Sequence, residues 1–569
     1  MATPSGQFHF VQHDNIGANA AEEDERFLRD CFVDTGDLGI LLDFDNPMCI
    51  VGGRTGCGKS ALLRELKTRH SDTIEIRPES LSFNYIANST IIRFFSDLGV
   101  NLDPFFKLLW RHVFALEVIQ RRFQITNEET KKNWLARFLE PRHEKAKREQ
   151  AGQRRKRALE YLQRYGDRFW EETEYRTKEI ATRFEEELRR ASGAKSKTDV
   201  GCAALPLQLS GDVSTNRESV KKLSQEERGE WVARGQSVIN AVQVKELDDI
   251  LYLLDEFMED AYHSYLIVID RLDDSWVDDS IRLRLIRALI DTVREFRRVR
   301  KVKIIIGMRR DLLERVFRMT RTADAGFQEE KFRSLYLPVI WTKPQLVELI
   351  DKRIARLVKD RYSKATVTHE DILKQRNLRM TKHGQHPIDF ILERTWMRPR
   401  DVIEFFNFCI AQARGKSHLT STMIQTAESE YSRSRFRSLA DEWCALYAGL
   451  PEFLMFYKKK ACTFQLSEIR TAEIDDFCLD YVIHHPDEDS QLATLAKLMV
   501  DGLDSHEHFR TTTAYVFYRV GACGLKTESY AEYQWCNEGT IALSPAEITD
   551  RALVMVHPAL WRVMGIVPK

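Results

Sequence analysis

An eight-residue segment, GRTGCGKS at positions 53–60, restricts what this chain can fold into more than any other feature. In the pattern G-x-x-x-x-G-K-[ST], the glycines let backbone N–H groups turn toward phosphates, the lysine reaches the β and γ oxygens, and the hydroxyl is offered to Mg²⁺. A short apolar stretch within 46–51 precedes the segment, and residues 61–70 follow it with helical apolar spacing. The sequence therefore predicts a strand, a phosphate-binding loop and a helix whose N-terminal dipole also favours anions.

The ligand predicted for this loop is ATP together with Mg²⁺. Lys59 is assigned to the phosphates and Ser60 to the metal ion. The residues predicted to contact the nucleotide are Gly53, Arg54, Thr55, Gly56, Cys57, Gly58, Lys59, Ser60 and Ala61.

An apolar strand that ends in an aspartate is the second predicted element of the site. Residues 265–269 (YLIVI) are all apolar, and Asp270 follows them. Beside a phosphate-binding loop, such an aspartate is predicted to hold Mg²⁺ together with Ser60, directly or through water. The structural alternative is a buried strand that simply ends at a turn aspartate. On the functional interpretation, Asp270 is both a metal ligand and a catalytic residue.

The identity of the catalytic base is left open by the next residues. Arg271 stands where many ATP-hydrolysing proteins with this motif carry a glutamate that polarises water. Asp273 and Asp274 are the candidates to take over that role as catalytic residues. If neither does so, hydrolysis would be slow and the nucleotide would act as a switch. The alternative for both aspartates is to cap the helix predicted to follow them.

A third element brings arginines to the end of a strand. The apolar stretch 302–307 leads into Arg309 and Arg310. Ligands of open α/β sheets bind at the C-terminal edge of the strands, so we expect these side chains near the γ-phosphate. Arg309 is predicted as a nucleotide contact and Arg310 as a catalytic residue. Alternatively, either guanidinium pairs with surface carboxylates.

The order of these elements predicts the fold class. Strands alternate with helices after the loop, which is typical of an α/β protein with an open, mostly parallel sheet. The predicted domains are a nucleotide-binding domain at 1–340 with a helical insertion at about 126–260, a helical lid at 341–440, and a winged-helix-like α+β domain at 441–569. Residues 192–217, rich in small and polar side chains, are predicted to be a loop or disordered.

With these motifs in place, the chain resembles the ASCE-type P-loop ATPases, specifically their STAND and KAP-like branch, over roughly residues 25–420. The shared features are the loop, the Asp-x-Leu-Asp turn at 270–273 and the Arg-Arg-Asp-Leu segment at 309–312. The chain is most similar to bacterial stand-alone P-loop ATPases that have a long helical insertion between the two phosphate-site motifs. Genes of that kind are often found in anti-phage defence clusters.

The resemblance also implies that an arginine of the lid reaches back to the nucleotide. The segment TWMRPRD at 395–401 looks like that element, which makes Arg398 or Arg400 the candidate. The alternative is a proline at a helix start, flanked by solvated arginines. Arg271 departs from the acidic pair common in the resembling proteins.

Charge is distributed unevenly along a chain whose 86 basic and 86 acidic residues cancel. Residues 142–157 hold eight Lys and Arg against two Glu, so nucleic acid is a possible partner there, although such a run is more often a solvated helix face. Residues 501–569 hold six Lys and Arg against eight Asp and Glu, which favours a protein contact over DNA. A protein partner or a homo-oligomer is therefore predicted.

The cytoplasm is the predicted compartment. The ten cysteines form no C-x-x-C pair, the N-terminus lacks a signal-peptide pattern, and no apolar run approaches the roughly 18 residues that a membrane span needs. We expect no membrane partner.

These observations lead to a Mg-ATP-dependent switch or motor as the first functional hypothesis, with an immune role implied only by the resemblance. The second is a DNA-directed ATPase that resembles initiator or helicase-loader proteins and uses the 142–157 segment. The third is an ATP-bound scaffold that does not hydrolyse its nucleotide. A small-molecule kinase is less favoured, because no acceptor pocket is indicated.

Overall fold

The computed structural model describes two compact units, which we call the sheet unit and the helical unit. The sheet unit comprises residues 37–52 and 62–337, and the helical unit comprises 1–36, 53–61 and 338–569. The residues described are 8–18, 23–81, 92, 96–123, 225, 228–229, 232–233, 236, 254–255, 263–274, 276–319, 332–359, 367–373, 384–488, 490–536 and 543–568. The predicted segments 142–157 and 192–217, and nearly all of the predicted insertion at 126–260, lie outside them.

A five-stranded sheet in the order β2-β3-β4-β1-β5 forms the centre of the sheet unit. Strand β3 pairs in parallel register with β2 on one side and β4 on the other, and its five side chains are buried. This confirms the predicted α/β fold class with a parallel sheet. The strands are β1 (Ile50–Gly53), β2 (Thr73–Ile76), β3 (Tyr265–Ile269), β4 (Val302–Arg309) and β5 (Tyr336–Pro338).

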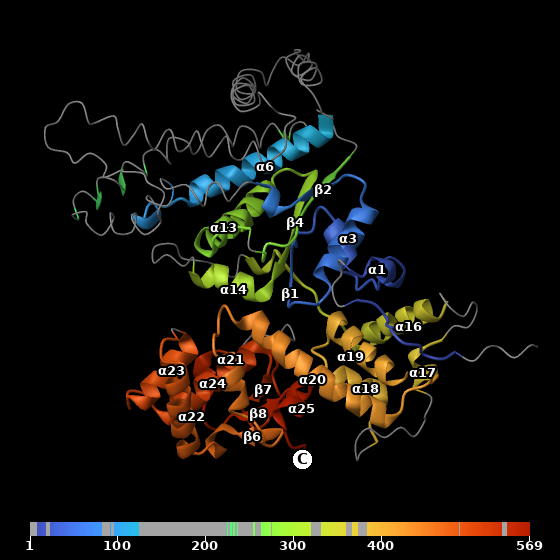
Figure 1. Ribbon diagram of the computed structural model, residues 1–569. Helices are drawn as coiled ribbons and strands as arrows, with labels where there is room; N and C mark the ends of the chain where they lie inside the picture. The colour runs from blue at the N-terminus through green and yellow to red at the C-terminus, as the bar shows by residue number, and fades with distance from the viewer. Residues whose placement is uncertain are drawn as a thin grey trace, which may run out of the picture. The chain divides into compact units, whose positions relative to one another are not determined.

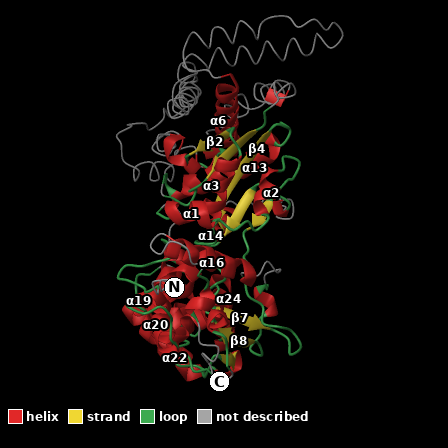
Figure 2. Ribbon diagram, turned by 90° about the vertical axis from the view of Figure 1, so that its right-hand side faces the viewer, coloured by secondary structure: helices red, strands yellow, loops and turns green. Residues whose placement is uncertain are grey.

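Helices cover this sheet (Figures 1 and 2). α13 packs on β4 and on α6, and Trp110 of α6 donates its indole N–H to the Leu285 carbonyl at 2.9 Å. The apolar faces of these helices bury Phe114 and Phe296 against each other, so packing rather than intrinsic propensity holds them. The helices of this part of the chain are α2 (Asp37–Leu42), α3 (Lys59–Arg69), η1 (Pro78–Leu81), α6 (Asp103–Phe123), α13 (Asp279–Phe296) and α14 (Arg310–Met319).

The helical unit joins a helix bundle to a small antiparallel sheet. Its strands β6 (Thr463–Gln465), β7 (Cys523–Lys526) and β8 (Leu553–Val556) pair in the order β6-β8-β7. Its longer helices are α1 (Glu25–Cys31), α16 (Lys343–Lys359), α18 (Pro387–Glu393), α19 (Pro399–Gln412), α20 (Ser421–Trp443), α22 (Thr471–His484), α23 (Gln491–Val500) and α24 (His506–Val520). Short turns of helix complete it: α17 (His369–Ile372), α21 (Leu450–Met455), η2 (Leu466–Glu468), η3 (Pro545–Glu547), η4 (Pro558–Leu560) and α25 (Trp561–Met564).

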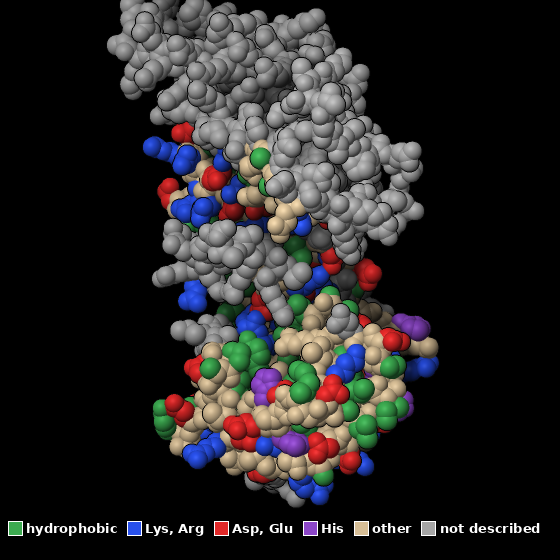
Figure 3. All heavy atoms as spheres, turned by 90° about the vertical axis from the view of Figure 1, so that its left-hand side faces the viewer, with side chains coloured by type: hydrophobic (Ala, Val, Ile, Leu, Met, Phe, Trp, Pro, Cys, Tyr) green, Lys and Arg blue, Asp and Glu red, His purple; other side chains and the backbone are tan. Residues whose placement is uncertain are grey.

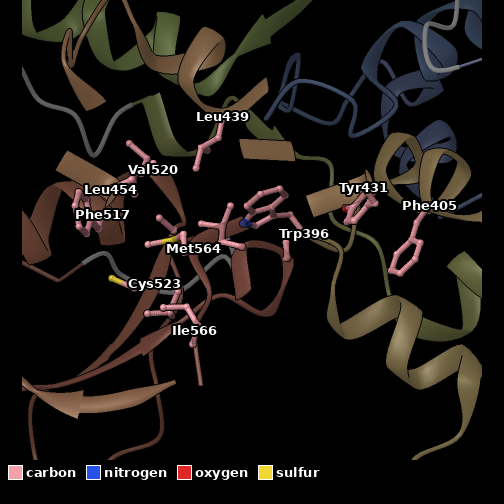
Figure 4. Close-up of a cluster of buried hydrophobic side chains, with 14 of the residues drawn as sticks. Trp396, Phe405, Tyr431, Leu439, Leu454, Phe517, Val520, Cys523, Met564 and Ile566 are labelled. Carbon is pink, nitrogen blue, oxygen red and sulfur yellow. The ribbon is translucent and has the colours of Figure 1, made fainter. Parts of the chain in front are cut away.

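One apolar core runs through the helical unit (Figure 4). Phe405 of α19 stacks on Tyr431 of α20 with ring centroids 4.6 Å apart, and the same core continues to Phe517 of α24. The boundary predicted between residues 440 and 441 falls inside α20, and residues on both sides of it share this core. The two segments predicted as a lid and a C-terminal domain are therefore packed together.

Candidate functional site

The 53–60 loop connects β1 to α3, in the strand-loop-helix arrangement that its sequence predicts. Gly56 and Gly58 have φ angles of 81° and 100°, which side chains rarely tolerate. A Cβ at Gly53 would lie 2.4 Å from the Cys57 sulfur, so this glycine is required by close approach instead. Each glycine of the pattern thus has a geometric reason to be there.

Lys59 turns back over the loop that precedes it. Its ammonium donates to the carbonyl oxygens of Gly53 at 3.1 Å and Arg54 at 3.0 Å. The Thr55 hydroxyl oxygen is buried and has no hydrogen-bond partner among the described residues. The loop therefore gathers a positive charge and an unsatisfied hydroxyl on residues where the sequence predicts phosphate contacts.

Three carbonyl oxygens of the loop are held by residues far along the chain within the helical unit. The Trp341 indole N–H donates to Cys57 O at 2.7 Å, and the Arg398 guanidinium donates to Thr55 O at 2.8 Å. The backbone N–H of Arg400 donates to Gly56 O at 3.2 Å. These three hydrogen bonds hold the loop conformation together with the loop's own glycines.

Arg398 is buried and joins the loop to two carboxylates. Beyond its bond to the loop, it pairs with Asp401 at 2.7 Å and with Glu442 at 3.5 Å. Asp401 is fully buried and also pairs with Arg435 at 2.8 Å. Burial would raise the pKa of Asp401, but Arg398 and Arg435 hold it below its ordinary value. A carboxylate between two guanidinium groups remains ionised here.

Arg400, the other arginine predicted to reach the nucleotide, lies over the loop. A Cβ at Gly56 would be 2.6 Å from the Arg400 Cβ, so the glycine also makes room for this side chain. Burial lowers the pKa of Arg400. The structure brings both predicted arginines to the loop, Arg398 as a hydrogen-bond donor to its backbone and Arg400 by packing.

Arg54 connects the loop to the small sheet through a stack of side chains. Its guanidinium lies 5.5 Å from the centroid of the Trp396 ring and pairs with Glu442 at 3.4 Å. Trp396 donates its indole N–H to Gly521 O at 2.8 Å and stacks on His557 with centroids 4.9 Å apart. Two aromatic rings therefore connect Arg54 to Gly521, which lies shortly before β7, and to His557, which directly follows β8.

His557 gives this stack a pH dependence. Burial and the neighbouring Arg54 lower its pKa from 6.5 to about 3, and its Nδ1 accepts a hydrogen bond from Ala559 N at 3.2 Å. The folded protein keeps this ring neutral whereas the unfolded chain protonates it below 6.5, so stability is full above that value and falls with acidification toward 3. We expect this group alone to cost about 2 kcal/mol of unfolding free energy at pH 5.

Urea unfolding of the wild type and of His557→Gln at pH 7 and at pH 5 measures this term. The variant should lose about 2 kcal/mol less than the wild type on acidification. His484→Gln, at an exposed position on α22, is the matched control and should behave as the wild type. An unchanged pH dependence in His557→Gln would show that the ring is not held neutral.

In the sheet unit, Asp270 follows directly after β3 and lies beside Gly307 of β4. A Cβ at Gly307 would come within 2.7 Å of an Asp270 carboxylate oxygen and 2.8 Å of Leu63 of α3. The glycine is therefore required by the close approach of this carboxylate. The predicted sharing of a metal ion between Asp270 and Ser60 stays a prediction.

The turn after Asp270 has an unusual backbone that a distant arginine supports. Arg271 has a φ of 60°, a left-handed conformation that is uncommon for a side chain other than glycine. Arg282 of α13 is buried and donates to the carbonyl oxygens of Asp273 at 3.2 Å and Asp274 at 2.7 Å. Burial, followed by the charge of Asp273, raises the pKa of Asp274. The fold therefore increases the proton affinity of Asp274, one of the two predicted bases.

The two arginines at the end of β4 and the start of α14 pair with carboxylates, as the structural alternative describes. Arg309 makes two bonds to Asp311, at 2.9 and 2.8 Å, and approaches Asp273 at 3.5 Å. Arg310 pairs with Glu314 one turn along α14, at 3.2 Å. Arg309 and Asp273 are thereby brought together at the strand ends of the sheet unit.

Two residues of this arrangement were not found from the sequence. Glu442 pairs with two loop-associated arginines from the end of α20, and Arg282 supports the turn after Asp270. Both lie in helices with ordinary amphipathic composition, so no local motif distinguishes them. Only their position in the fold assigns them a role.

Comparison with known proteins finds a similar domain family and a similar bacterial protein. Residues 344–440, which include Arg398 and Arg400, match the family described as the FunZ-associated C-terminal helical domain. The chain is 21% identical to the transposon gamma-delta 80.3 kDa protein of Escherichia coli (strain K12), over 96% of this chain and 66% of that protein. It thus spans less than two thirds of the length of that relative. No solved structure matches the chain.

The helices of the described part of the chain were also compared with the requirements of a bilayer. None of them is both long enough and apolar enough to cross a membrane.

Proposed function

We propose that this protein binds Mg-ATP in the 53–60 loop and uses it as a nucleotide-dependent switch. The observation that carries the proposal is the G-x-x-x-x-G-K-S pattern on a loop between a buried strand and a helix that starts at Lys59. In this position the N-terminus of α3 and the Lys59 ammonium both favour anionic phosphates. The cell compartment that fits this role is the cytoplasm.

The residues present suit a triphosphate. Gly56 and Gly58 lack a Cβ atom and adopt positive φ angles, and Thr55 offers a buried hydroxyl that lacks a partner among the described residues. Bound Mg²⁺ would neutralise phosphate charge and stabilise the charge that develops when the γ-phosphoryl group is transferred to water. Lys59 would exchange its bonds to the loop carbonyls for bonds to the phosphate oxygens, and Ser60 and Asp270 would hold the metal.

A direct measurement of binding tests this proposal. Titration calorimetry of the full chain with ATP and with a non-hydrolysable analogue, each with Mg²⁺, should give one saturable site per chain. AMP should bind far more weakly, because the proposed contacts are to the β- and γ-phosphates. Equal affinity for AMP and ATP would move the site away from the 53–60 loop.

Hydrolysis tests the second half of the proposal. Asp270→Asn should keep nucleotide binding but lower magnesium-dependent phosphate release by at least about 100-fold, because the metal would lose its charged ligand. Asp278→Asn, at an exposed aspartate eight residues later, is the matched control. Phosphate release from Asp270→Asn at the wild-type rate would remove Asp270 from the catalytic residues.

The loop contacts favour a switch over a simple hydrolase. Trp341, Arg398 and the Arg400 backbone hold three loop carbonyl groups, so a nucleotide that repositions the loop would shift these contacts. The displacement would pass through Trp396 to β7 and β8. We propose that this motion controls a protein partner or self-assembly, with anti-phage defence as the setting that the resemblance implies.

The C-terminal part is proposed to be a winged-helix-like module. Its strand order β6-β8-β7, with helices between β6 and β7, supports this assignment. The net acidic composition of residues 501–569 favours a protein contact over DNA for this module.

A DNA-directed ATPase is the second candidate. Two observations favour it: the similar Escherichia coli protein is named as a transposon protein, and residues 142–157 are strongly basic. On this proposal, duplex DNA binds with a steep salt dependence that decreases when Arg154, Arg155 and Arg157 are replaced. A scaffold that binds ATP without hydrolysing it is the third candidate. Arg271 favours it, because this residue stands where many ATP-hydrolysing proteins with the same motif carry a glutamate. Bound ATP that persists for hours would support it.

A further inference from the structure

The outer face of α22 and the turn after α23 expose aliphatic side chains among carboxylates. Ile483 is 63% exposed and Leu503 73%, which is unusual for residues that ordinarily lie in a core. Figure 3 views the side of the molecule on which these helices lie in Figure 1, and shows hydrophobic, acidic and histidine side chains interspersed there. We call this surface the acidic face; its residues are Asp475, Asp476, Leu479, Asp480, Ile483, Asp487, Val500, Asp501, Leu503 and Asp504.

These residues form one surface because the helices are packed together. α22 and α23 contact each other, and His506 at the start of α24 bonds to Asp475 of α22 at 2.8 Å. Leu503 lies three residues before His506, and Leu479 lies one turn after Asp475. The N-terminal half of α22, which carries Asp475, therefore lies beside the start of α24.

Among the described residues, no Lys or Arg forms an ion pair with the carboxylates of this face. The ion-pair partners of Asp475, Asp480 and Asp504 are histidines, at 2.8, 3.4 and 2.6 Å. Asp476 and Asp487 have no ion-pair partner among the described residues. Residues 471–509 hold ten Asp and Glu and a single Lys, so the negative potential of this face is uncompensated within its own segment.

The same chain carries a segment of the opposite charge. Residues 142–157 hold eight Lys and Arg against two Glu, and Leu159 and Leu162 follow immediately. A chain with no net charge thus contains one strongly acidic surface and one strongly basic segment, each with aliphatic side chains beside the charges. This complementarity in both charge and apolar character favours an occupant from the chain itself.

We propose that the acidic face binds the basic 142–157 segment of a second copy of this chain. Because the two contacting surfaces are different, the contact is heterologous, and each copy retains one acidic face and one basic segment for the next. Assembly then proceeds head to tail into a ring or a filament. The contact does not require nucleotide, so the proposal does not rest on ATP binding.

Charge exchange between two full-length variants tests the contact. The face variant carries Asp476→Lys, Asp480→Lys and Asp487→Lys, all at exposed positions, and the segment variant carries Arg154→Glu, Arg155→Glu and Arg157→Glu. Sedimentation velocity without nucleotide should show self-association of the wild type that weakens with salt. Each variant alone should associate at least about 30-fold more weakly.

Mixing the two variants should restore association, because the native face of one meets the native segment of the other and the two altered surfaces are again opposite in charge. The matched control, Glu370→Lys with Glu393→Lys and Glu430→Lys, makes the same change of net charge at exposed positions outside the acidic face and should associate as the wild type. A monomeric wild type, a mixture that stays dissociated, or a control as weak as the face variant would overturn the proposal.

Discussion

Replacing Lys59 by alanine should weaken Mg-ATP binding about 10- to 100-fold, since one charge-assisted hydrogen bond to a phosphate contributes roughly 1.5–3 kcal/mol. Phosphate release should fall further, because the same ammonium would stabilise charge that develops on the γ-phosphate. In this structure the Lys59 ammonium contacts only carbonyl groups and a sulfur of its own loop among the described residues, so its removal leaves the core unchanged. Calorimetry and a steady-state phosphate assay measure the two effects.

Lys67→Ala is the control for this experiment. Lys67 lies two turns further along α3 and pairs with Glu75 at 2.8 Å at the surface. Its replacement should leave nucleotide affinity unchanged. If Lys59→Ala kept the affinity and turnover of the wild type, the 53–60 loop would not be the nucleotide site.

The second large effect is expected on stability. Asp401→Asn should lower the free energy of unfolding of the helical unit by about 3–5 kcal/mol, because it leaves two buried guanidinium groups without their shared carboxylate. Asp401 is fully buried, bonds to Arg398 and Arg435, and accepts a hydrogen bond from Trp396 N at 3.2 Å. Chemical unfolding, followed by Trp fluorescence, measures this loss.

Asp441→Asn is the matched control, an exposed aspartate on α20 whose replacement should change stability by less than about 0.5 kcal/mol. A loss in Asp401→Asn no greater than that of the control would mean that the buried ion pairs contribute little. Arg398 also donates to Thr55 O, so a less firmly held guanidinium should disturb the 53–60 loop. Nucleotide affinity is therefore expected to decrease in parallel.

The sheet was predictable because its signal is local. Residues 265–269 are apolar at every position, and the structure buries them all between two parallel neighbours. β4 extends two residues beyond the predicted 302–307, since Met308 is buried and continues the strand to Arg309. The loop glycines were equally readable, because each of them has a backbone or packing constraint that only glycine meets.

The contacts around the loop were not predictable because their partners are far apart in sequence. Arg54 and Glu442 are separated by 388 residues, and Trp341 lies 284 residues from the carbonyl it holds. Neither Glu442 nor the left-handed backbone of Arg271 has a compositional signature. Such features depend on how helices pack, which one sequence does not specify locally.

That the 53–60 loop packs within the helical unit affects how the protein can be dissected. A fragment that stops at residue 340 would retain all eight motif residues, yet Arg54 would lose its carboxylate partner and Cys57 O its indole donor. Weak nucleotide binding by such a fragment would then report the missing supports rather than a defective motif. Fragments made to test the proposed nucleotide site should therefore extend at least through α20, whose last turn carries Glu442.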